Sequence, residues 1–203
     1  MSKQIVIIGA SGHGKVIADI AEKNRYEKIV FLDDNIAVKN CGKYPVVGTS
    51  CDALLYSESD FIVGIGRSDV RMRLQDQLTE KGLHIVSLIH PNAVITESVA
   101  IGIGTVVMAG VVINSGAKIG SGCIINTCSS VDHDCIIEDY AHISVGAHIA
   151  GSVCVGKHTW IGAGATVINN IRITDDCMIG AGAVVVKNIE DKGIYKGIPA
   201  RCE

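Results

Sequence analysis

Aromatic residues are scarce in this chain, which has 203 residues but only 4% Phe, Trp and Tyr. Few aromatic rings leave no stacking platform for nucleic-acid bases. An excess of positive charge is lacking too, since the formal net charge is −3 and the isoelectric point is near 6.1. Both features argue against a general nucleic-acid binder.

Long apolar segments are missing as well, and we expect no secretory signal peptide. No uninterrupted apolar run approaches about 18 residues, so the sequence predicts no transmembrane helix. The N-terminus reads Met1-Ser2-Lys3-Gln4 and passes directly into a short strand-like run, which is unlike a secretory signal peptide. We therefore expect a cytoplasmic protein.

Cysteine pairs of the C-x-x-C type are absent, although the chain has eight cysteines. Without such pairs, neither a zinc site nor a disulfide framework is a good interpretation. We expect the cysteines to be reduced, small core residues, as is usual in a reducing cytosol, and we expect no bound metal.

What the chain does contain is a long six-residue repeat. From Ile95 to Val185, every sixth residue is Ile or Val, sixteen positions in all. The residue two places earlier is small in nearly every case and includes Cys123, Cys135 and Cys177. This period fits neither a helix nor a plain strand and is typical of a parallel β-helix. Three hexapeptides would close one triangular coil, so the run predicts a little over five coils.

The N-terminal part of the chain has a different pattern of apolar residues. Residues 5–8, 29–32 and 61–66 have the apolar runs of buried strands, and the residues after Gly14 and from 70 to 81 have helical spacing. Alternating strands and helices predict a small parallel α/β sheet of the Rossmann-like type.

A final strand is expected over residues 84–89. We predict an α/β domain over residues 1–88, the β-helix over 89–190 and a C-terminal tail over 191–203.

A glycine-rich turn, Gly9 to Gly14, follows the first predicted strand. Backbone N–H groups at the start of a helix favour an anion, so this turn is a candidate phosphate cradle. Its G-x-x-G-x-G spacing departs from the G-x-G-x-x-G dinucleotide fingerprint, which disfavours NAD. Asp33 and Asp34 could hold a ribose or a base edge. A tight turn with a capping carboxylate explains these residues equally well, but His13 favours a ligand because an imidazole can donate to a phosphate or sugar hydroxyl.

The segment from Asn126 to Cys135 is the second candidate site. His133 comes two residues after the inward Val131, so it should face out of the prism, between Asp132 and Asp134. A carboxylate bonded to one ring nitrogen raises the basicity of the other, which suits a general base. The alternative is an ordinary exposed polar corner.

His142 follows His133 after half a coil. Within one prism the two side chains should therefore lie on opposite sides, whereas packed prisms could bring His133 of one copy to His142 of another. This spacing suggests a homotrimer with composite sites between subunits.

Several motifs resemble a known family. The segments S-S-V-D-H-D-C and A-H-I-S-V-G-A-H-I-A-G, together with the hexapeptide coils, are similar to the left-handed β-helix acyltransferases. The N-terminal I-V-I-I-G-A-S-G-H-G and F-L-D-D are similar to the sialic acid O-acetyltransferase-like branch, and within it to UDP-4-amino-sugar N-acetyltransferases of bacillosamine pathways. The resemblance covers essentially the whole chain and implies a left-handed helix, a homotrimer and acetyl-CoA as co-substrate.

The resemblance also implies roles for individual residues. His133 would be the catalytic base, Asp134 would tune it, and Asn126 matches a polar position near the base. His142 would contact the acetyl thioester. Backbone positions along the CoA groove would be Gly151, Ala163 and Ala181. The nucleotide-sugar pocket would comprise Ser11, Gly12, His13, Asp33, Asp34 and Gly66.

The implied reaction is direct acetyl transfer from acetyl-CoA to the 4-amine of a UDP-linked 4-amino-4,6-dideoxy sugar, a step of glycan or polysaccharide biosynthesis. One alternative is O-acetylation of a sialic acid or another sugar hydroxyl. A second is a non-catalytic protein that binds a nucleotide sugar, because fold alone does not fix function. A nucleotide-dependent oxidoreductase is disfavoured by the glycine spacing.

Overall fold

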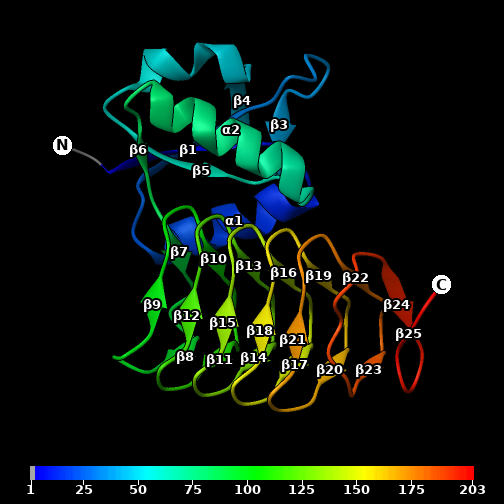
Figure 1. Cartoon of the computed structure of the whole chain (residues 1–203). Helices are drawn as coiled ribbons and strands as arrows, with labels where there is room; N and C mark the ends of the chain where they lie inside the picture. The colour runs from blue at the N-terminus through cyan, green and yellow to red at the C-terminus, as the bar shows by residue number, and fades with distance from the viewer. Residues whose placement is uncertain (1–2) are drawn as a thin grey trace. The chain divides into compact units, whose positions relative to one another are not determined.

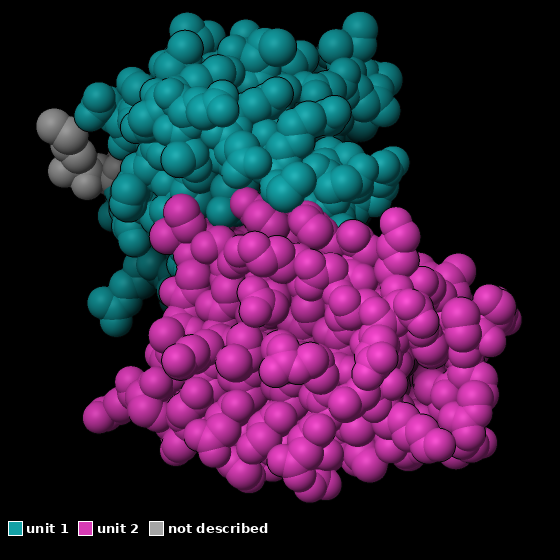
Figure 2. All heavy atoms as spheres, viewed as in Figure 1, with its two compact units in different colours: residues 1–91 teal, residues 92–203 magenta. Residues whose placement is uncertain are grey.

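The computed structural model describes residues 3–203, and the chain divides into two units, residues 1–91 and 92–203 (Figure 2). Among the described residues, no helix is both long and apolar enough to cross a membrane.

Unit 1 is a Rossmann-like α/β fold around a six-stranded sheet in the order β3-β4-β2-β1-β5-β6. Its strands are β1 Gln4–Ile8, β2 Lys28–Leu32, β3 Asn40–Cys41, β4 Tyr44–Gly48, β5 Asp60–Val63, β6 His84–Ile85 and, outside that sheet, β7 Leu88–Ile89. Its helices are α1 Gly12–Lys23, the 3-10 helix η1 Ser50–Tyr56 and α2 Ser68–Glu80. All neighbours in the sheet are parallel except β3 and β4.

Apolar runs explain why β1, β2 and β5 lie at the centre of this sheet. Ile5, Val6 and Ile7 are fully buried, as expected for a parallel strand that is covered on both faces. Helix α1 buries Ile17, Ala18, Ile20 and Ala21, whose spacing of three and four residues forms one helical face, together with Gly14.

Three details of unit 1 differ from the sequence prediction. The helix after the glycine-rich turn begins at Gly12, so His13 lies in its first turn rather than in a loop. Val16, which shares the helical spacing, is exposed. The strand expected over residues 84–89 is two short strands, because pairing of β6 with β5 ends at Ile85 and β7 begins at Leu88.

Unit 2 is a left-handed parallel β-helix of two-residue strands, whose successive coils stand side by side (Figure 1). We name its three walls after one strand each. Within unit 2, the β16 wall comprises β10 Val106–Val107, β13 Ile124–Ile125, β16 His142–Ile143, β19 Trp160–Ile161, β22 Met178–Ile179, β24 Ile194–Lys196 and β25 Arg201–Cys202. The β14 wall comprises β8 Val94–Ile95, β11 Val112–Ile113, β14 Ser130–Val131, β17 His148–Ile149, β20 Thr166–Val167 and β23 Val184–Val185. The β15 wall comprises β9 Ala100–Ile101, β12 Lys118–Ile119, β15 Ile136–Ile137, β18 Cys154–Val155 and β21 Arg172–Ile173.

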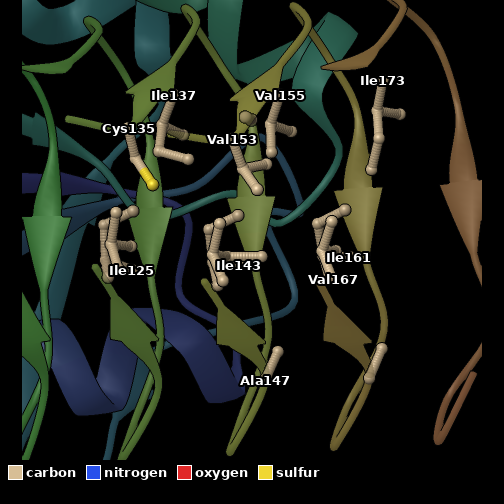
Figure 3. Packing of buried hydrophobic residues seen from close by; sticks show 14 of the residues in the cluster. Ile125, Cys135, Ile137, Ile143, Ala147, Val153, Val155, Ile161, Val167 and Ile173 are labelled. Carbon is tan, nitrogen blue, oxygen red and sulfur yellow. The ribbon is translucent and has the colours of Figure 1, made fainter. Parts of the chain in front are cut away.

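The repeat of Ile and Val forms the core of this prism. Figure 3 shows Ile125, Ile143 and Ile161 on neighbouring strands, and each is fully buried. Burial of one such side chain contributes about 1.5–3 kcal/mol, so the long ladder stabilises the prism strongly. Cys135, in the small inward position, is also fully buried, which confirms that it points into the core.

Strand pairing between the coils, from β8 to β23, joins residues exactly one coil apart, as in Ile124↔His142 and His142↔Trp160. Each outward residue therefore has its counterpart on the next coil as its neighbour. This rule decides which side chains can meet on the surface. At the C-terminal end, β24 and β25 pair antiparallel and cover the last coil.

Candidate active site

His133 lies on the turn that joins β14 to β15. The turn needs a residue with positive φ after His133, and Asp134 takes that position with φ 58°. Gly116 and Asn170 take the equivalent position one coil before and two coils after, which are residue types that tolerate this region. The turn therefore presents His133 outward, with 58% of its side chain exposed.

Two carboxylates hold His133, one through its ring and one through its backbone. Its Nδ1 lies 2.9 Å from Oδ2 of Asp134, and its backbone N–H donates to Oδ1 of Asp132 over 2.7 Å. The hydrogen bond to Asp134 and then the negative charge of Asp132 raise the pKa of His133 above its ordinary value. A raised pKa makes the neutral ring a stronger base, as predicted from the sequence.

Asn114 was not predicted as part of this site. Its Nδ2 donates to Oδ1 of Asp132 over 2.8 Å. This bond and the backbone N–H of His133 lower the pKa of Asp132, so its carboxylate stays charged beside the ring. The sequence could have indicated this contact, because Asn114 and Asp132 are 18 residues apart. That separation is one coil, the register in which β11 pairs with β14.

His142 lies elsewhere, on the outer face of the β16 wall. Its Nε2 is 3.1 Å from Nδ2 of Asn126, whose Oδ1 accepts the backbone N–H of Thr127 over 2.8 Å. That second bond orients the amide, so Nδ2 donates to the imidazole. The structure thus places Asn126 beside His142, rather than beside His133 of the same chain.

Trp160 covers the other side of His142, and it was not predicted. The two rings are stacked, with centroids 5.5 Å apart and planes within 2°. The indole N–H donates to Oγ of Ser144 over 2.5 Å. Asn126, Trp160 and Ser144 together fix the orientation of the imidazole. The sequence could have indicated the ring stack, because His142 and Trp160 are one coil apart and pair directly.

The three predicted backbone positions lie on two edges of the prism. Ala163 and Ala181 are exposed on the turns after β19 and β22, one coil apart. Gly151 is buried on the turn after β17, directly next to the ring of His133. Gly151 therefore lies in contact with His133, whereas Ala163 and Ala181 lie on the edge between the β16 and β14 walls.

The second group of predicted residues lies in unit 1, where β1, β2 and β5 end. Asp33 accepts two backbone N–H groups, from Ala10 over 2.6 Å and from Asn35 over 2.8 Å, so it fastens the glycine-rich turn. Asp34 accepts the backbone N–H of Ser50 over 2.9 Å. A small cavity of about 120 Å³ beside Asp33 is lined by Asp33, Ile36, Val38, Lys39, Val46, Gly48 and Thr49.

Ser11, Gly12 and Gly66 belong to the same region of unit 1. Ser11 is the N-cap of α1, and its hydroxyl donates to the carbonyl of Gly64 over 3.4 Å. Gly12 is exposed, and its Cβ position meets open space. The carbonyl of Gly66 accepts Nη1 of Arg71 over 2.8 Å.

His13 has electrostatics opposite to those of His133. Its Nε2 is buried and has no hydrogen-bond partner among residues 3–203. Burial and then the positive charge of Arg71 lower its pKa to about 4. The ring is therefore neutral at physiological pH, and it lies at the start of a helix, where backbone N–H groups favour an anionic ligand.

Family models match both units of the chain. Residues 4–78 match the PglD N-terminal domain, and residues 153–187 match the bacterial transferase hexapeptide (six repeats). The acetyltransferase domain of PglB from Neisseria gonorrhoeae FA1090, solved in complex with acetyl coenzyme A, has a TM-score of 0.96 and 36% identity. That comparison covers 100% of both chains. The chain belongs to the PglD-type hexapeptide acetyltransferases.

Two further relatives extend the comparison. PerB from Caulobacter crescentus, solved with CoA and GDP-perosamine, has a TM-score of 0.94 and 36% identity, covering 100% of this chain and 98% of PerB. UDP-N-acetylbacillosamine N-acetyltransferase of Bacillus subtilis (strain 168) is 36% identical over 113 residues. That match spans 53% of this chain and about half, 52%, of the length of the relative.

Metal ligands do not gather anywhere in residues 3–203, where no group of three or more His, Cys, Asp or Glu could hold an ion. Other groups in this PglD-type chain suit an acyl thioester and an amine: an outward imidazole with carboxylate support, and a fixed Asn126–His142 pair.

Proposed function

We propose that this protein transfers an acetyl group from acetyl-CoA to the 4-amine of a nucleotide-linked 4-amino-4,6-dideoxy sugar, with UDP as the expected nucleotide. The observation that carries the proposal is the outward His133, whose Nδ1 is bonded to Asp134 at 2.9 Å. Two relatives named above support it: a UDP-N-acetylbacillosamine N-acetyltransferase, and PerB, which was solved with CoA and GDP-perosamine.

His133 acts as the general base. The bond to Asp134 keeps the ring proton on Nδ1, so Nε2 has the lone pair and accepts the proton that the attacking amine loses. The imidazolium so formed is stabilised by the charges of Asp134 and Asp132. The same proton then returns to the departing thiolate, which leaves as the free thiol of CoA. The amine nitrogen gains the acetyl carbon and loses one proton, so no covalent enzyme intermediate is needed.

The Asn126–His142 pair would hold the thioester. A fixed amide and imidazole are polar groups that can orient a carbonyl group and donate to its oxygen as negative charge develops there. Ala163 and Ala181, which are exposed and one coil apart, would give the pantetheine arm a stretch of edge without bulky side chains.

The active site is completed by a second copy of the chain in a homotrimer. His133 lies on the edge between the β14 and β15 walls, whereas His142 lies on the β16 wall, so one prism presents them in different directions. Trp160 is 45% exposed and Met178 38% exposed in the same column as His142, which is typical of a surface that another subunit covers. A monomeric mass of 21.3 kDa at micromolar concentration would contradict this assembly.

Unit 1 binds the nucleotide end of the acceptor. His13, Ser11 and Gly12 at the start of α1 would contact the phosphates, and the cavity lined by Asp33 would receive part of the nucleoside. Binding of this remote part supplies energy that orients the amine for attack.

A thiol-release assay tests the proposal directly. Acetyl-CoA is offered with UDP- and GDP-linked 4-amino-4,6-dideoxy sugars and with a sialic acid, and the product is treated with mild alkali. We expect thiol release with a 4-amino sugar and an alkali-stable amide. An alkali-labile ester would indicate O-acetylation, and no thiol release with any acceptor would indicate a binding protein instead.

A matched control separates His133 from histidines in general. His84 also has a carboxylate on Nδ1, since Asp60 lies 2.6 Å away, but it belongs to β6 of unit 1, outside the proposed site. His133→Ala should abolish thiol release, whereas His84→Ala should leave it unchanged.

A further inference from the structure

The ring of His133 leans over the next coil of the prism, where it meets Gly151. A Cβ atom built on Gly151 would lie 2.5 Å from Nε2, 2.6 Å from Cε1 and 3.1 Å from Cδ2 of His133. These three ring atoms are the nearest neighbours of that position. The edge of the imidazole that includes the proton-accepting nitrogen therefore occupies the space that any other residue's side chain would fill.

Backbone conformation does not explain the glycine. Gly151 is not among the glycines with positive φ, so alanine could adopt its backbone angles. Gly116 provides the contrast: its Cβ position is 2.6 Å from Oδ1 of Asp134, but its φ of +74° already favours glycine. Of these two glycines, Gly151 is the one whose lack of a side chain is explained by the ring of His133 alone.

The other coils support the same explanation. The residue two places after the inward Ile or Val of the β14 wall occupies the same turn position in each coil, because the strands of this wall pair in register from coil to coil. Along this row the residues are Glu97, Ser115, His133, Gly151, Asn169 and Lys187. All of them except the glycine have a side chain, so the turn accepts one, and the single glycine follows the histidine by one coil.

We infer that Gly151 is a positioning residue for the base: its missing side chain lets the ring of His133 stay bonded to Asp134 with Nε2 open to the substrate amine. This inference rests on the proposed role of His133 and deepens it. It differs from a role of Gly151 in binding CoA through its backbone, because alanine would keep the backbone N–H and remove only the space.

The consequence of filling that space follows from the exposure of His133. The side chain is 58% exposed, so its ring can rotate away from a new methyl group at little cost to the fold. Rotation breaks the 2.9 Å contact with Asp134 and moves Nε2 from its place. The substitution should therefore reduce turnover much more than it reduces stability.

The experiment compares Gly151→Ala with Asn169→Ala, which leaves the same methyl group in the same row, one coil further from His133. For Gly151→Ala we expect kcat to fall at least about 100-fold, as for loss of a general base, with both KM values within about threefold of wild type. Asn169→Ala should keep the kcat of the wild type. A kcat within about threefold of wild type for Gly151→Ala would overturn the inference.

A spectroscopic readout distinguishes this inference from the proposed function. The pKa of His133 is measured by NMR on ¹³C-histidine-labelled protein, and its signal is identified by its absence in His133→Ala. In Gly151→Ala the pKa should fall toward the ordinary value of about 6.5, because the ring has left Asp134. An unchanged pKa combined with a tenfold higher KM for acetyl-CoA would assign Gly151 to the cofactor groove and overturn the inference. This measurement needs no activity, so it stands even if the acetyl-transfer assay fails.

The double variant His133→Ala/Gly151→Ala covers the case of misfolding. Without the ring, the three atoms nearest to the new methyl group are gone, so the melting temperature should equal that of His133→Ala. If Gly151→Ala fails to fold but the double variant folds, the clash with the ring is confirmed. If neither folds, the glycine serves the fold itself and the inference is wrong.

Discussion

The start of α1 in unit 1 and the His133 turn in unit 2 each present a histidine, and they treat it in opposite ways. His13 is half-buried near Arg71, and its pKa falls to about 4, whereas His133 is exposed between two aspartates that raise its pKa. A neutral imidazole that stays neutral suits binding. An imidazole that readily takes a proton suits catalysis. The difference teaches that the surroundings of a histidine decide its charge, and under the proposed function they would assign binding to His13 and proton transfer to His133.

Replacement of His133 tests the catalytic half of this comparison and should have the largest effect. His133→Ala should lower kcat by about 10²- to 10⁴-fold, the usual contribution of general base catalysis. Steady-state kinetics of thiol release provides the measurement, with His84→Ala as the control. Near-normal turnover of His133→Ala would remove the residue from the base role.

The aspartate behind the base should have the next largest effect. Asp134→Asn removes the negative partner of Nδ1 and should lower kcat by about 10- to 100-fold. Because only the neutral ring accepts a proton, kcat should rise with pH through the pKa of His133 and then level off. The substitution lowers that pKa, so the rise should move to lower pH. A rise at unchanged pH would show that Asp134 does not act through His133.

His13 tests the binding half of the comparison. His13→Ala should raise KM for the nucleotide sugar by about 10- to 100-fold and leave kcat and the KM for acetyl-CoA nearly unchanged, since a hydrogen bond to a charged group contributes about 1.5–3 kcal/mol. Kinetics at varied concentrations of each substrate separates the two effects. An equal loss in kcat would place His13 in the chemistry and erase the distinction between the two histidines.

The pH dependence of stability gives the smallest and most specific test. The folded pKa of His13, about 4, lies below its ordinary value of 6.5, so between these values the unfolded chain binds more protons. Stability should therefore fall as the pH falls through this window, by on the order of 2 kcal/mol from pH 7 to pH 5 for this group. His13→Asn should show a smaller loss than wild type in urea unfolding. Identical losses would mean that His13 is not buried as a neutral ring.

Much of the β-helix could be predicted from the sequence because its signal is local and repeated. An Ile or Val at every sixth residue requires an inward position each time, and this phase also places His133 outward. The contact of His133 with Asp134 followed from their adjacency. The fold of unit 1 could be predicted less fully from the sequence, since the pairing of β6 ends before the predicted strand does.

The missed features depend on neighbours that are distant in sequence. Asn126 meets His142, and His142 meets Trp160, through contacts between one coil and the next. The low pKa of His13 depends on burial and on the charge of Arg71, which lies on another helix. Such contacts depend on strand register and side-chain orientation, which composition does not reveal. The periodicity reveals them only when outward residues one coil apart are compared, as the inward residues were.

One NMR titration of ¹³C-histidine-labelled protein tests the central claim most directly, because it reads both rings in a single sample. We expect the His133 signal, identified with His133→Ala, to titrate above pH 6.5, and the His13 signal, identified with His13→Asn, to remain that of a neutral ring down to about pH 5. Titration of both rings together near pH 6.5 would contradict the account.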